Sequence, residues 1–423
     1  MKILVVGGGG REHALIRKIK ESPKAEKIYC CPGNGGIGAD AQCVPIAAVD
    51  VQGVVKFAKE NQIDLVVVAP DDPLAMGMVD ALDAQGIMTF GPRKIAAEIE
   101  SSKVFAKNMM KKFGIPTAAY EVFDKAEKAL EYIEKNNQFP VVIKADGLAL
   151  GKGVIIAQNL NEAKGGIHEI MEDKVFGASG NNVVVEEFLT GPEVSVLAFV
   201  DSKTIVPMVS SMDHKRALDG DQGLNTGGMG TIAPNPFYTK EVADQCMETI
   251  FRPTVEAMNK MGRPFQGCLY FGLMLTPKGP QVIEYNCRFG DPETQVVMEL
   301  LESDLVDIME AIYRKDLKNC PVQFSSGAAA CIVIASGGYP KAYKKGCPIS
   351  GLDEQGQLPE VSVYHAGTKL ENGQYLTNGG RVLGVTAKGA SLEEALDKAY
   401  SSAEQISFEG AFYRKDIGAR CKK

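Results

Sequence analysis

Several features that mark secreted, metal-scaffolded or membrane proteins are missing from this sequence. The 423 residues include only ten cysteines, and no two of them form a C-x-x-C pair. Disulfide frameworks and zinc modules depend on recurring cysteine spacings, so we interpret these cysteines as reduced thiols. No apolar run approaches the ~18 residues of a membrane span, and the N-terminus has no leader-like apolar region. We therefore expect a cytoplasmic protein without membrane contact.

A surplus of positive charge is also missing. Lysine and arginine number 46 against 53 aspartates and glutamates, which gives a net charge of −7. Proteins that wrap nucleic acid or bind anionic membranes usually carry a basic surplus. We therefore expect neither nucleic acid nor membrane as a partner, and small-molecule chemistry is favoured.

Glycine, by contrast, is abundant. The chain has 45 glycines, whereas an average usage of about 7% predicts about 30. There is no three-residue period, prolines number only 21 and the hydrophobic fraction is 45%, so neither a collagen-like fibre nor a linker explains the excess. Sixteen of the glycines gather at residues 7–10, 33–38, 147–153 and 220–230. We interpret these four segments as loops where the backbone closely approaches a ligand.

The length predicts about three domains of ~150 residues each, and the pattern of apolar runs indicates a multidomain chain of mixed α/β and α+β class. Residues 1–100 alternate apolar strands with helical stretches, which predicts a doubly wound parallel sheet. Residues 101–325 begin with a helix at 102–113 and continue with shorter strands between charged helices. Residues 326–423 change to short alternating strands with paired glycines, which predicts a small β-rich C-terminal domain.

The first glycine cluster follows a strand and opens a helix, the setting in which free backbone N–H groups bind phosphate. It is not a dinucleotide fingerprint, because G-x-G-x-x-G counted from Gly7 puts Glu12 in the last place, and counted from Gly8 puts His13 there. Two interpretations stay open: an anion site for a phosphate-bearing substrate, or glycines that only tighten the turn. A second cluster at 33–36 is expected at the same sheet edge, which favours the anion site.

A lysine and a glycine loop follow in the middle of the chain. Lys144 ends a β-branched run, and Gly147 to Gly153 lead into a strand at 154–157. The loop is not a Walker A motif, because Gly153 stands in place of the metal-binding hydroxyl and a strand follows. Alone, the segment suits a solvated hairpin lysine equally well.

A strand predicted at 282–288 places Glu284, Asn286 and Arg288 on one face, because side chains alternate along a strand. Carboxylate and amide oxygens suit a Mg²⁺ ion that also binds substrate phosphates, and a neighbouring arginine can stabilise a transferring phosphoryl group. The alternative is an exposed face with an ion pair between Glu284 and Arg288. The preceding strand, 268–275, holds no acid, so the number of metal ions stays open.

Residues 213–230 have no hydrophobic period and are expected to form a long loop. Its DHKR run at 213–216 would usually be solvated surface. The glycine-rich continuation at 225–230 favours a ligand-binding loop instead.

Together these segments resemble the phosphoribosylamine–glycine ligase family of the ATP-grasp superfamily. The resemblance covers essentially the whole chain, and it is carried by GGREHAL (9–15), PGN (32–34), DHKR (213–216), NTGGMG (225–230), NCRFGDPET (286–294), HAGTK (365–369) and NGGR (378–381). It implies that residues 101–325 are the ATP-grasp region, with a lid subdomain at about 121–190 and a central subdomain at about 191–325. It also implies the ligation of glycine to 5-phosphoribosylamine in purine biosynthesis, with ATP cleaved to ADP and phosphate by way of glycyl phosphate.

The same resemblance implies roles for individual residues. The expected ATP contacts are Lys103, Lys144, Gly147, Gly151, Lys152, Gly153, Glu186, Glu187, Phe188, Leu189, Glu193, Arg216 and Asn225, and the expected Mg²⁺ or Mn²⁺ ligands are Glu284 and Asn286. The expected substrate contacts are Gly9, Gly10, Asn34, Asp71, His214, Lys215, Thr226, Gly227, Gly228, Met229, Gly290, Pro292 and Glu293. The expected catalytic residues are Arg288, Asp291 and Asp213. We expect a monomer whose partners are ATP, glycine and 5-phosphoribosylamine.

One stretch departs from the family. Residues 70–74 are PDDPL where the family usually has PEAPL, so the contacts that Asp71 makes to phosphoribosylamine stay open. Among the histidines, His168 is expected on a helix surface, whereas His13 suits helix packing as well as ligand contact.

Two other functions remain as alternatives. One is a carboxylating ATP-grasp ligase acting on aminoimidazole ribonucleotide, which should lack the REHAL and DHKR segments. The other is a non-catalytic nucleotide sensor, which has no need of Arg288 beside Glu284 and Asn286.

Overall fold

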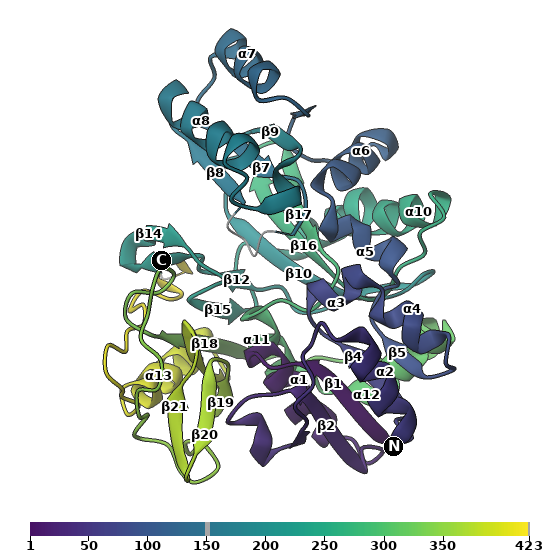
Figure 1. Cartoon of the computed structure of the whole chain (residues 1–423), viewed down its shortest axis with the longest axis vertical. Coiled ribbons are helices and arrows are strands. Elements are labelled where there is room, and N and C mark those ends of the chain that lie inside the picture. The colour runs from purple at the N-terminus through teal and green to yellow at the C-terminus, as the bar shows by residue number, and fades with distance from the viewer. Residues whose placement is uncertain (149–152, 422–423) are drawn as a thin grey trace.

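The structure is a computed structural model that describes residues 1–148 and 153–421. A small upper lobe, which contains β7, β8, β9, α7 and α8, rises above a broad lower body (Figure 1). The N-terminal and C-terminal parts of the chain lie side by side in that lower body, at the purple and yellow ends of the colour range (Figure 1).

The N-terminal part is a five-stranded parallel sheet in the order β3-β2-β1-β4-β5. Its strands are β1 (Lys2–Gly7), β2 (Lys27–Pro32), β3 (Gln42–Cys43), β4 (Leu65–Val68) and β5 (Met88–Phe90), and its helices are α1 (Gly10–Lys20), α2 (Val51–Glu60), α3 (Asp71–Met76), α4 (Met78–Asp83) and α5 (Lys94–Ser101). Alternate residues of β1 pack in two different cores, one shared with α1 and the other with α2. Both faces are therefore covered, which confirms the doubly wound sheet.

The upper lobe contains an antiparallel sheet in the order β6-β9-β7-β8. Its strands are β6 (Tyr120–Phe123), β7 (Val141–Ala145), β8 (Val154–Ala157) and β9 (Val183–Glu187), and its helices are α7 (Ala126–Asn136) and α8 (Leu160–Ile167). These elements pack around a hydrophobic core of their own. The lobe is therefore a separate packing unit above the body.

The centre of the molecule is a second antiparallel sheet in the order β11-β10-β16-β17. Its strands are β10 (Glu193–Asp201), β11 (Ile205–Pro207), β16 (Gln266–Thr276) and β17 (Gly279–Asn286), flanked by α6 (Lys103–Phe113), α9 (Lys240–Cys246), α10 (Arg252–Lys260) and α12 (Leu305–Arg314). Two hydrophobic cores join this sheet to the N-terminal sheet. The strand predicted to reach residue 288 ends at Asn286, so Arg288 lies just beyond it.

The C-terminal part is a five-stranded sheet in the order β12-β15-β18-β22-β19. Its strands are β12 (Met212–Asp213), β15 (Gly230–Ala233), β18 (Ala328–Ala335), β19 (Ser362–His365) and β22 (Arg381–Gly389), joined by the hairpin β20 (Thr368–Glu371)–β21 (Gln374–Thr377) and by the helices α11 (Glu293–Leu300) and α13 (Leu392–Ala403). Because β12 and β15 come from the middle of the chain, this sheet crosses the expected boundary at 325/326. The domain bounds themselves stay predictions.

The expectation of a structureless loop at 213–230 is wrong. The segment begins in β12, ends in β15 and contains a hairpin of β13 (Arg216–Leu218) and β14 (Gln222–Asn225). The strands are too short to show a hydrophobic period, and most of their residues are exposed or only partly buried. Cross-strand hydrogen bonding, which a single segment's pattern does not reveal, creates them.

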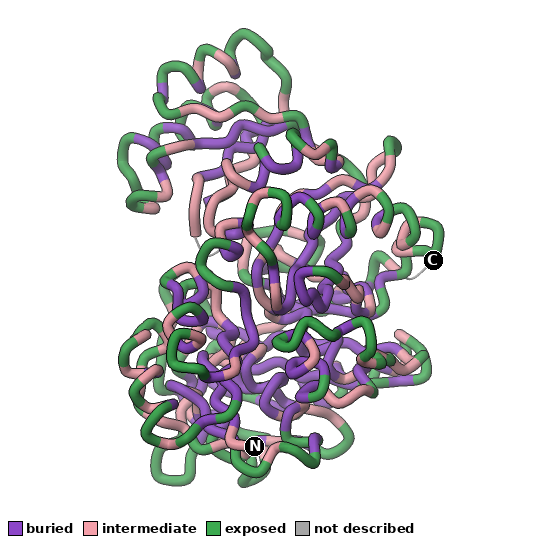
Figure 2. Tube along the Cα trace, turned by 90° about the vertical axis from the view of Figure 1, so that its right-hand side faces the viewer, coloured by how far each residue is buried: buried purple, intermediate pink, exposed green. Residues whose placement is uncertain are grey.

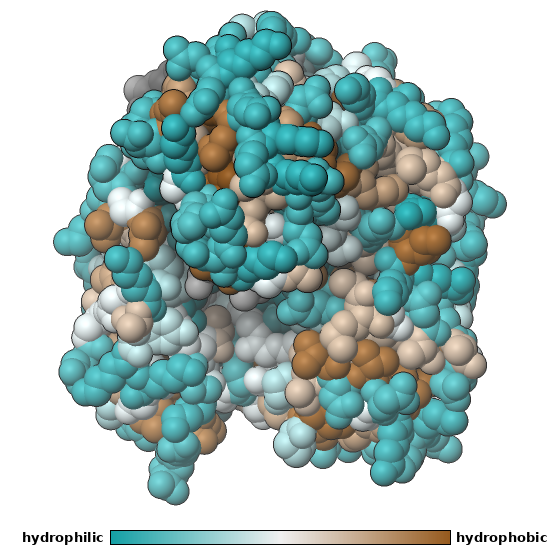
Figure 3. All heavy atoms as spheres, turned by 45° about the horizontal axis from the view of Figure 1, so that its top comes forward, coloured by the Kyte–Doolittle hydropathy of each residue, from teal (hydrophilic) through white to brown (hydrophobic). Residues whose placement is uncertain are grey.

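Buried residues concentrate along the strands of the body and are scarce at the outer edge of the upper lobe (Figure 2). A recess opens below the upper lobe in the space-filling view, and much of its floor has intermediate hydropathy (Figure 3). Among the described residues, no helix combines the length and apolar character that a membrane crossing requires.

Candidate active site

Two buried lysines contact one carboxylate where the upper lobe joins the central sheet. The Nζ atoms of Lys107 on α6 and Lys144 on β7 each lie 3.0 Å from Oε2 of Glu186 on β9. The other oxygen, Oε1 of Glu186, is buried without a hydrogen-bond partner in the described part of the chain. Burial, opposed by the charge of Glu186, lowers the pKa of Lys107 to about 8. This cluster combines positive charge with an unused buried acceptor, as an ATP-binding wall requires.

Lys103 and the start of the glycine loop lie against each other. Lys103 Nζ donates a hydrogen bond of 2.8 Å to the carbonyl of Gly147, which has a φ of +102°. Ser102 caps α6 and also donates to Asp146 Oδ1, so the loop's first residues are tied to the helix. The carbonyl of Gly153 accepts the N–H of Ala145, whereas Gly151 and Lys152 lie outside the described residues.

The expected nucleotide-base segment follows β9. Glu187 ends the strand and is exposed, and Phe188 and Leu189 are partly buried beyond it. Glu193 begins β10 and lines a cavity, together with Asp213, Lys215 and Glu284. The residues expected at the base and the ribose therefore bracket one loop between β9 and β10.

The expected metal ligands lie on the same face of β17. Glu284 is opposite Gly272 and Asn286 opposite Tyr270 in the ladder with β16. Burial raises the pKa of Glu284, but the charges of Lys215, Lys144 and Lys103 outweigh it and the net shift is downward. Glu284 is therefore held as a carboxylate, with Lys215 Nζ 3.5 Å from its Oε1.

Arg288 is bound by a residue that the sequence did not single out. Its Nη2 lies 3.0 Å from Oε1 of Glu100, at the end of α5, and donates to Asn286 Oδ1 at 3.3 Å. Oε2 of Glu100 accepts the N–H of Cys287 at 2.7 Å. The charges of Glu100 and Asp71 raise the pKa of Arg288 against the effect of its burial. The alternative ion pair between Arg288 and Glu284 is thus not the one formed.

A buried acidic cluster adjoins the metal ligands. Tyr270 OH donates to Glu293 Oε1 at 3.1 Å and shares a 2.7 Å hydrogen bond with Ser195 Oγ. Burial, followed by the charge of Glu293, raises the pKa of Asp213 well above its usual range. Two carboxylates that repel each other in a buried place can accept a cationic group readily, because it relieves their repulsion.

A second cavity, of about 360 Å³, lies between the N-terminal and C-terminal parts. It is lined by Gly8, Gly9, Gly33, Asn34, Asp291, Ala366, Gly367, Thr368, Asn378 and Arg381. Arg381 donates to the carbonyl of Asp291 at 2.8 Å, and its guanidinium lies 3.4 Å from Asp291 Oδ1. Asn34 donates to the carbonyls of Gly8 and His365, so one side chain joins both walls. Thr368, Asn378 and Arg381 were not named as site residues, although they lie in or next to the HAGTK and NGGR segments.

The N-terminal glycine turn is already bound to carboxylates. Glu12 Oε2 accepts the N–H of Gly9 at 2.6 Å, and Asp291 Oδ2 accepts the N–H of Arg11 at 3.2 Å. A Cβ atom at Gly8 would lie 2.5 Å from the carbonyl oxygen of Gly33, which explains the glycine by loop packing. The geometry favours the tight-turn interpretation over a phosphate on these two N–H groups. Contacts of Gly9 and Gly10 with substrate stay a prediction.

The 213–230 segment divides its residues between the cavities and the C-terminal domain. Asp213 and Lys215 line the first cavity. The His214 ring instead hydrogen-bonds the Gly230 carbonyl and the Gly418 N–H, and Met229 is fully buried. Neither of these two side chains lines either cavity, so the structure gives no support to their expected substrate contacts.

The rest of this segment lies beside the Arg381 side of the second cavity. Thr226 is bonded to Lys215, and Arg216 faces Asn225 in the hairpin. Built Cβ atoms at Gly227 and Gly228 would collide with Arg381 and with Pro292, respectively. Gly290 has the same relation to Glu293, which would lie 2.3 Å from its Cβ. These glycines let side chains and backbone approach closely.

Two histidines have structural surroundings. His13 is buried, accepts the N–H of His365 at Nδ1 and contacts Asp40 through Nε2, in agreement with its helix-packing interpretation. His168 is exposed on the helical segment His168–Glu172, as expected for a surface position.

Comparison with known proteins identifies the class and then the family. Family models described as phosphoribosylglycinamide synthetase N domain, ATP-grasp (A) domain and C domain match residues 1–100, 101–294 and 329–420. A biotin carboxylase structure from Campylobacter jejuni shares the fold, with a TM-score of 0.75 at 15% identity over 97% of this chain and 92% of that one. The match to the ATP-grasp (A) domain model over residues 101–294, within three matched domains that span the chain, defines an ATP-grasp enzyme.

Closer relatives narrow the class. The phosphoribosylamine–glycine ligase of Caldanaerobacter subterraneus subsp. tengcongensis is 49% identical over 99% of this chain and 100% of that protein, and that of Clostridium acetobutylicum is 47% identical over 99% of both. The crystal structure of the Thermotoga maritima phosphoribosylamine–glycine ligase has a TM-score of 0.87 at 36% identity and covers 99% of this chain and 100% of that one. The chain belongs to the phosphoribosylamine–glycine ligase family.

Proposed function

We propose that this enzyme joins glycine to 5-phosphoribosylamine at the expense of ATP, giving glycinamide ribonucleotide, ADP and phosphate, as a step of purine biosynthesis. The proposal rests on residues 284–291, which run from the first cavity to the second. Glu284 lines the first cavity, Asp291 lines the second, and Arg288 lies between them in the chain. A single short segment thus connects a nucleotide-metal site with a site for a second substrate.

The ATP site of this proposal spans the lid and the central sheet. Lys103 and Lys144 neutralise the phosphates, beside Gly147 and Gly153 at the two described ends of the glycine loop. Glu186 to Leu189 and Glu193 hold the adenine and the ribose. Arg216 and Asn225 approach from the hairpin. Lys107 joins this set, because it shares Glu186 Oε2 with Lys144.

The residues fit a magnesium ion, or a manganese ion in its place. Glu284 is kept ionised by three lysines and Asn286 supplies an amide oxygen, which are hard donors of the kind that Mg²⁺ accepts alongside phosphate oxygens and waters. Glu284 and Asn286 would hold the ion, and phosphate oxygens and waters would supply its other ligands. When bound, the ion offsets the charge of the γ-phosphoryl group.

Two steps follow. The glycine carboxylate attacks the γ-phosphorus of ATP, which forms glycyl phosphate and releases ADP. The amine of phosphoribosylamine then attacks the glycyl carbonyl, loses a proton and expels phosphate. Arg288, held by Glu100, stabilises the negative charge that collects on the acyl phosphate.

The second substrate fits the 360 Å³ cavity between the terminal domains. Arg381 offers a guanidinium for a sugar phosphate, and Asn34 shapes the wall by joining Gly8 to His365. Asp71 is proposed to contact the same substrate. Asp213 and Glu293 would receive the glycine ammonium group, since their neighbouring carboxylates favour a cation. Gly227, Gly228 and Gly290 lie against Arg381, Pro292 and Glu293, respectively, and are proposed to allow the substrates a close approach.

The function is tested by phosphate release from ATP with Mg²⁺, glycine and freshly made phosphoribosylamine. Release should require both glycine and phosphoribosylamine, and omission of either should reduce it to background. Release that does not depend on glycine would refute the ligase, and a dependence on bicarbonate with aminoimidazole ribonucleotide would support the carboxylating alternative.

The metal assignment is tested by Glu284→Gln. The amide is isosteric but neutral, so the Mg²⁺ concentration for half-maximal rate should rise by about tenfold or more. An unchanged Mg²⁺ dependence in a folded variant would place the ion elsewhere.

We also propose that the enzyme acts as a cytoplasmic monomer on small molecules alone. The acidic net charge of −7 supports a protein without a nucleic-acid partner. Light scattering coupled to size exclusion should give the mass of one chain, and a dimer mass would refute this.

A further inference from the structure

The hairpin β13–β14 lacks a hydrophobic anchor of its own. Leu218 and Leu224, its two leucines, are 51% and 49% exposed, and Ala217 is its one buried apolar residue. Two short strands with so little buried surface are marginally stable in isolation. Yet Lys215 directly precedes the hairpin and contacts Glu284, and Arg216 and Asn225 belong to it. Something outside the hairpin must fix its position.

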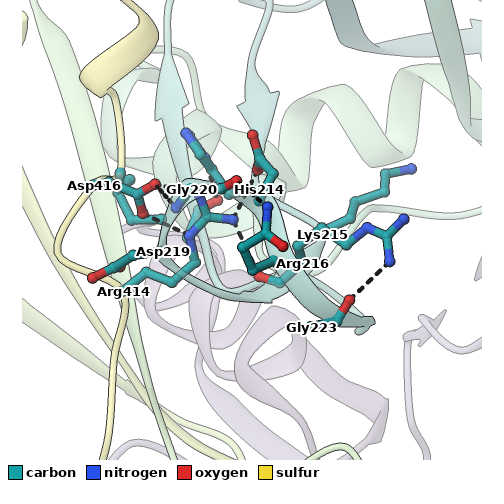
Figure 4. A network of polar contacts seen from close by, with 12 residues as sticks. His214, Lys215, Arg216, Asp219, Gly220, Gly223, Arg414 and Asp416 are labelled. Carbon is teal, nitrogen blue, oxygen red and sulfur yellow. Dashed lines mark hydrogen bonds and ion pairs between the residues drawn. The ribbon is translucent and has the colours of Figure 1, made fainter.

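A buried arginine from the end of the chain supplies that contact. Arg414 is 2% exposed, and its Nη1 donates to the Arg216 carbonyl at 3.1 Å and to Asp221 Oδ1 at 3.0 Å. Its Nε and Nη2 bind both oxygens of Asp416 at 2.7 and 2.8 Å. Nη1 of Arg414 thus reaches the hairpin, while Nε and Nη2 fix the guanidinium on Asp416 of the same C-terminal segment (Figure 4).

Backbone hydrogen bonds run alongside this arginine. Asp416 Oδ2 accepts the N–H of Gly220 at 2.8 Å, and Asp219 Oδ1 accepts the N–H of Lys415 at 2.8 Å. The N–H of Gly418 donates to His214 Nε2 at 3.1 Å (Figure 4). The C-terminal segment therefore binds the hairpin at its first residue, Arg216, and at its turn, residues 219–221.

The C-terminal segment is itself firmly held by the C-terminal domain. Tyr400 OH on α13 donates to the Arg414 carbonyl at 3.0 Å and accepts the N–H of Ile417 at 2.9 Å. Phe412 forms a two-hydrogen-bond bridge with Ala335 at the end of β18. Ile417 is 2% exposed and packs against Gly230. The segment can therefore act as a fixed support.

We infer that residues 414–418 hold the hairpin 216–225 in the position from which it serves the nucleotide, with Arg414 as the positioning residue. The part of this inference that assigns the hairpin to the nucleotide rests on the proposed function. Arg414 reaches no substrate in this account; it acts through the Arg216 carbonyl, Asp221 and Asp416. A planar guanidinium is needed because a lysine ammonium cannot bond a carbonyl and two carboxylates in fixed directions.

The test compares Arg414→Gln, Arg414→Lys and Asp221→Asn in the full chain. We expect Arg414→Gln to raise the KM for MgATP by at least about tenfold, because displacement of a site group by about 1 Å can cost more than that. Arg414→Lys should recover only part of the loss. Asp221→Asn removes the charge of a partly exposed carboxylate on the hairpin side and should shift KM in the same direction. It provides the test if Arg414→Gln does not fold.

Lys344→Gln is the matched control. It breaks the exposed 2.7 Å ion pair between Lys344 and Glu409 in the same domain and touches nothing in the hairpin. Its KM for MgATP should equal that of the unmodified chain. Hydrogen exchange in the peptide 216–225 should speed up in the Arg414 and Asp221 variants and stay unchanged in the control.

Affinity for a non-hydrolysable ATP analogue, measured by calorimetry, separates this inference from the proposed ligation. Loss of that affinity in the variants supports the positioning role even if the unmodified chain shows no glycine-dependent turnover. Folded variants with faster hairpin exchange but unchanged nucleotide affinity and KM would overturn it, as would variants with unchanged exchange.

Discussion

The reacting groups of this enzyme are oriented by residues that themselves carry no expected role. Arg288 is fixed by Glu100, and Lys144 shares Glu186 with Lys107. In both cases a buried carboxylate compensates a buried cation, which would otherwise be costly. The charge balance around Arg288 and Lys144 therefore depends on Glu100 and Lys107, which were not visible as site residues in the sequence.

Arg288→Ala tests the role of the arginine in the transition state. The structure puts its guanidinium beyond the metal ligands, so kcat should fall by about two to three orders of magnitude, while the affinity for MgADP changes little. Single-turnover phosphate release and calorimetry measure the two quantities. Complete loss of nucleotide affinity would contradict the assignment to the acyl phosphate and place Arg288 in the ATP site.

At the scale of elements, neighbouring side chains restrict which residue a short loop can contain. Gly228 has a φ of +124°, and a Cβ atom there would lie 2.4 Å from Pro292 Cδ and 2.5 Å from Asp213 Oδ1. The loop between β14 and β15 is thus pressed against the loop before α11. Glycine is required by the neighbours as much as by the local backbone.

Gly228→Ala should therefore both destabilise the protein and impair catalysis. The cost should exceed about 1 kcal/mol, because the native φ suits no L-residue, and kcat should fall as Asp213 is displaced. Urea unfolding and initial rates measure the two effects. Gly165→Ala on α8 is the control: nothing lies within 4 Å of a Cβ there, so its stability should be equal or slightly higher. Normal stability and kcat in Gly228→Ala would refute the packing argument.

At the scale of the whole molecule, buried histidines join the terminal domains to each other and to the central part. His13 of α1 contacts His365 of the C-terminal domain, and His214 contacts Gly418. Burial lowers the pKa of His214 to about 4 and that of His365 to about 3, and it also lowers the pKa of His13. These two contacts unite distant parts of the chain, and each is accepted by a neutral ring, that of His13 or that of His214.

This predicts a loss of stability in mild acid. A histidine in the unfolded chain has a pKa of about 6.5, so the unfolded chain binds protons below this pH. In the folded chain His214 is not protonated until the pH is near 4. The stabilisation that comes from keeping these rings neutral should thus be complete above pH 6.5. As the pH drops to 4, the free energy of unfolding should fall by a few kcal/mol, because each unit of pKa shift corresponds to about 1.4 kcal/mol. Urea titrations at pH 7.5, 6 and 5 measure it.

Removal of a buried ring tests the origin of this dependence. His214→Gln should reduce the slope of stability against pH, because the lowered pKa of His214 contributes to it. Equal stability at pH 7.5 and pH 5 in the unmodified chain would contradict the account.

The sequence by itself determined the class of fold, the parallel N-terminal sheet and the common face of Glu284 and Asn286. These follow from periodicity within one element, where neighbouring residues decide which side is buried. The motif runs added the family, because each is a fixed local order of residues. Of the expected site residues, Gly9, Asn34, Glu193, Asp213, Lys215, Glu284 and Asp291 line one of the two cavities, and the roles of all of them stay predictions.

Tertiary structure alone decided that Glu100 holds Arg288, that Lys107 joins Lys144 and that Arg381 lines the second cavity. It also revealed Arg414 beneath a hairpin that appeared in the sequence as a loop. In each case the partners lie far apart in the chain. Periodicity reports which face of an element is buried and not which element covers it, so the pairing of these charges is fixed only when separate elements pack together.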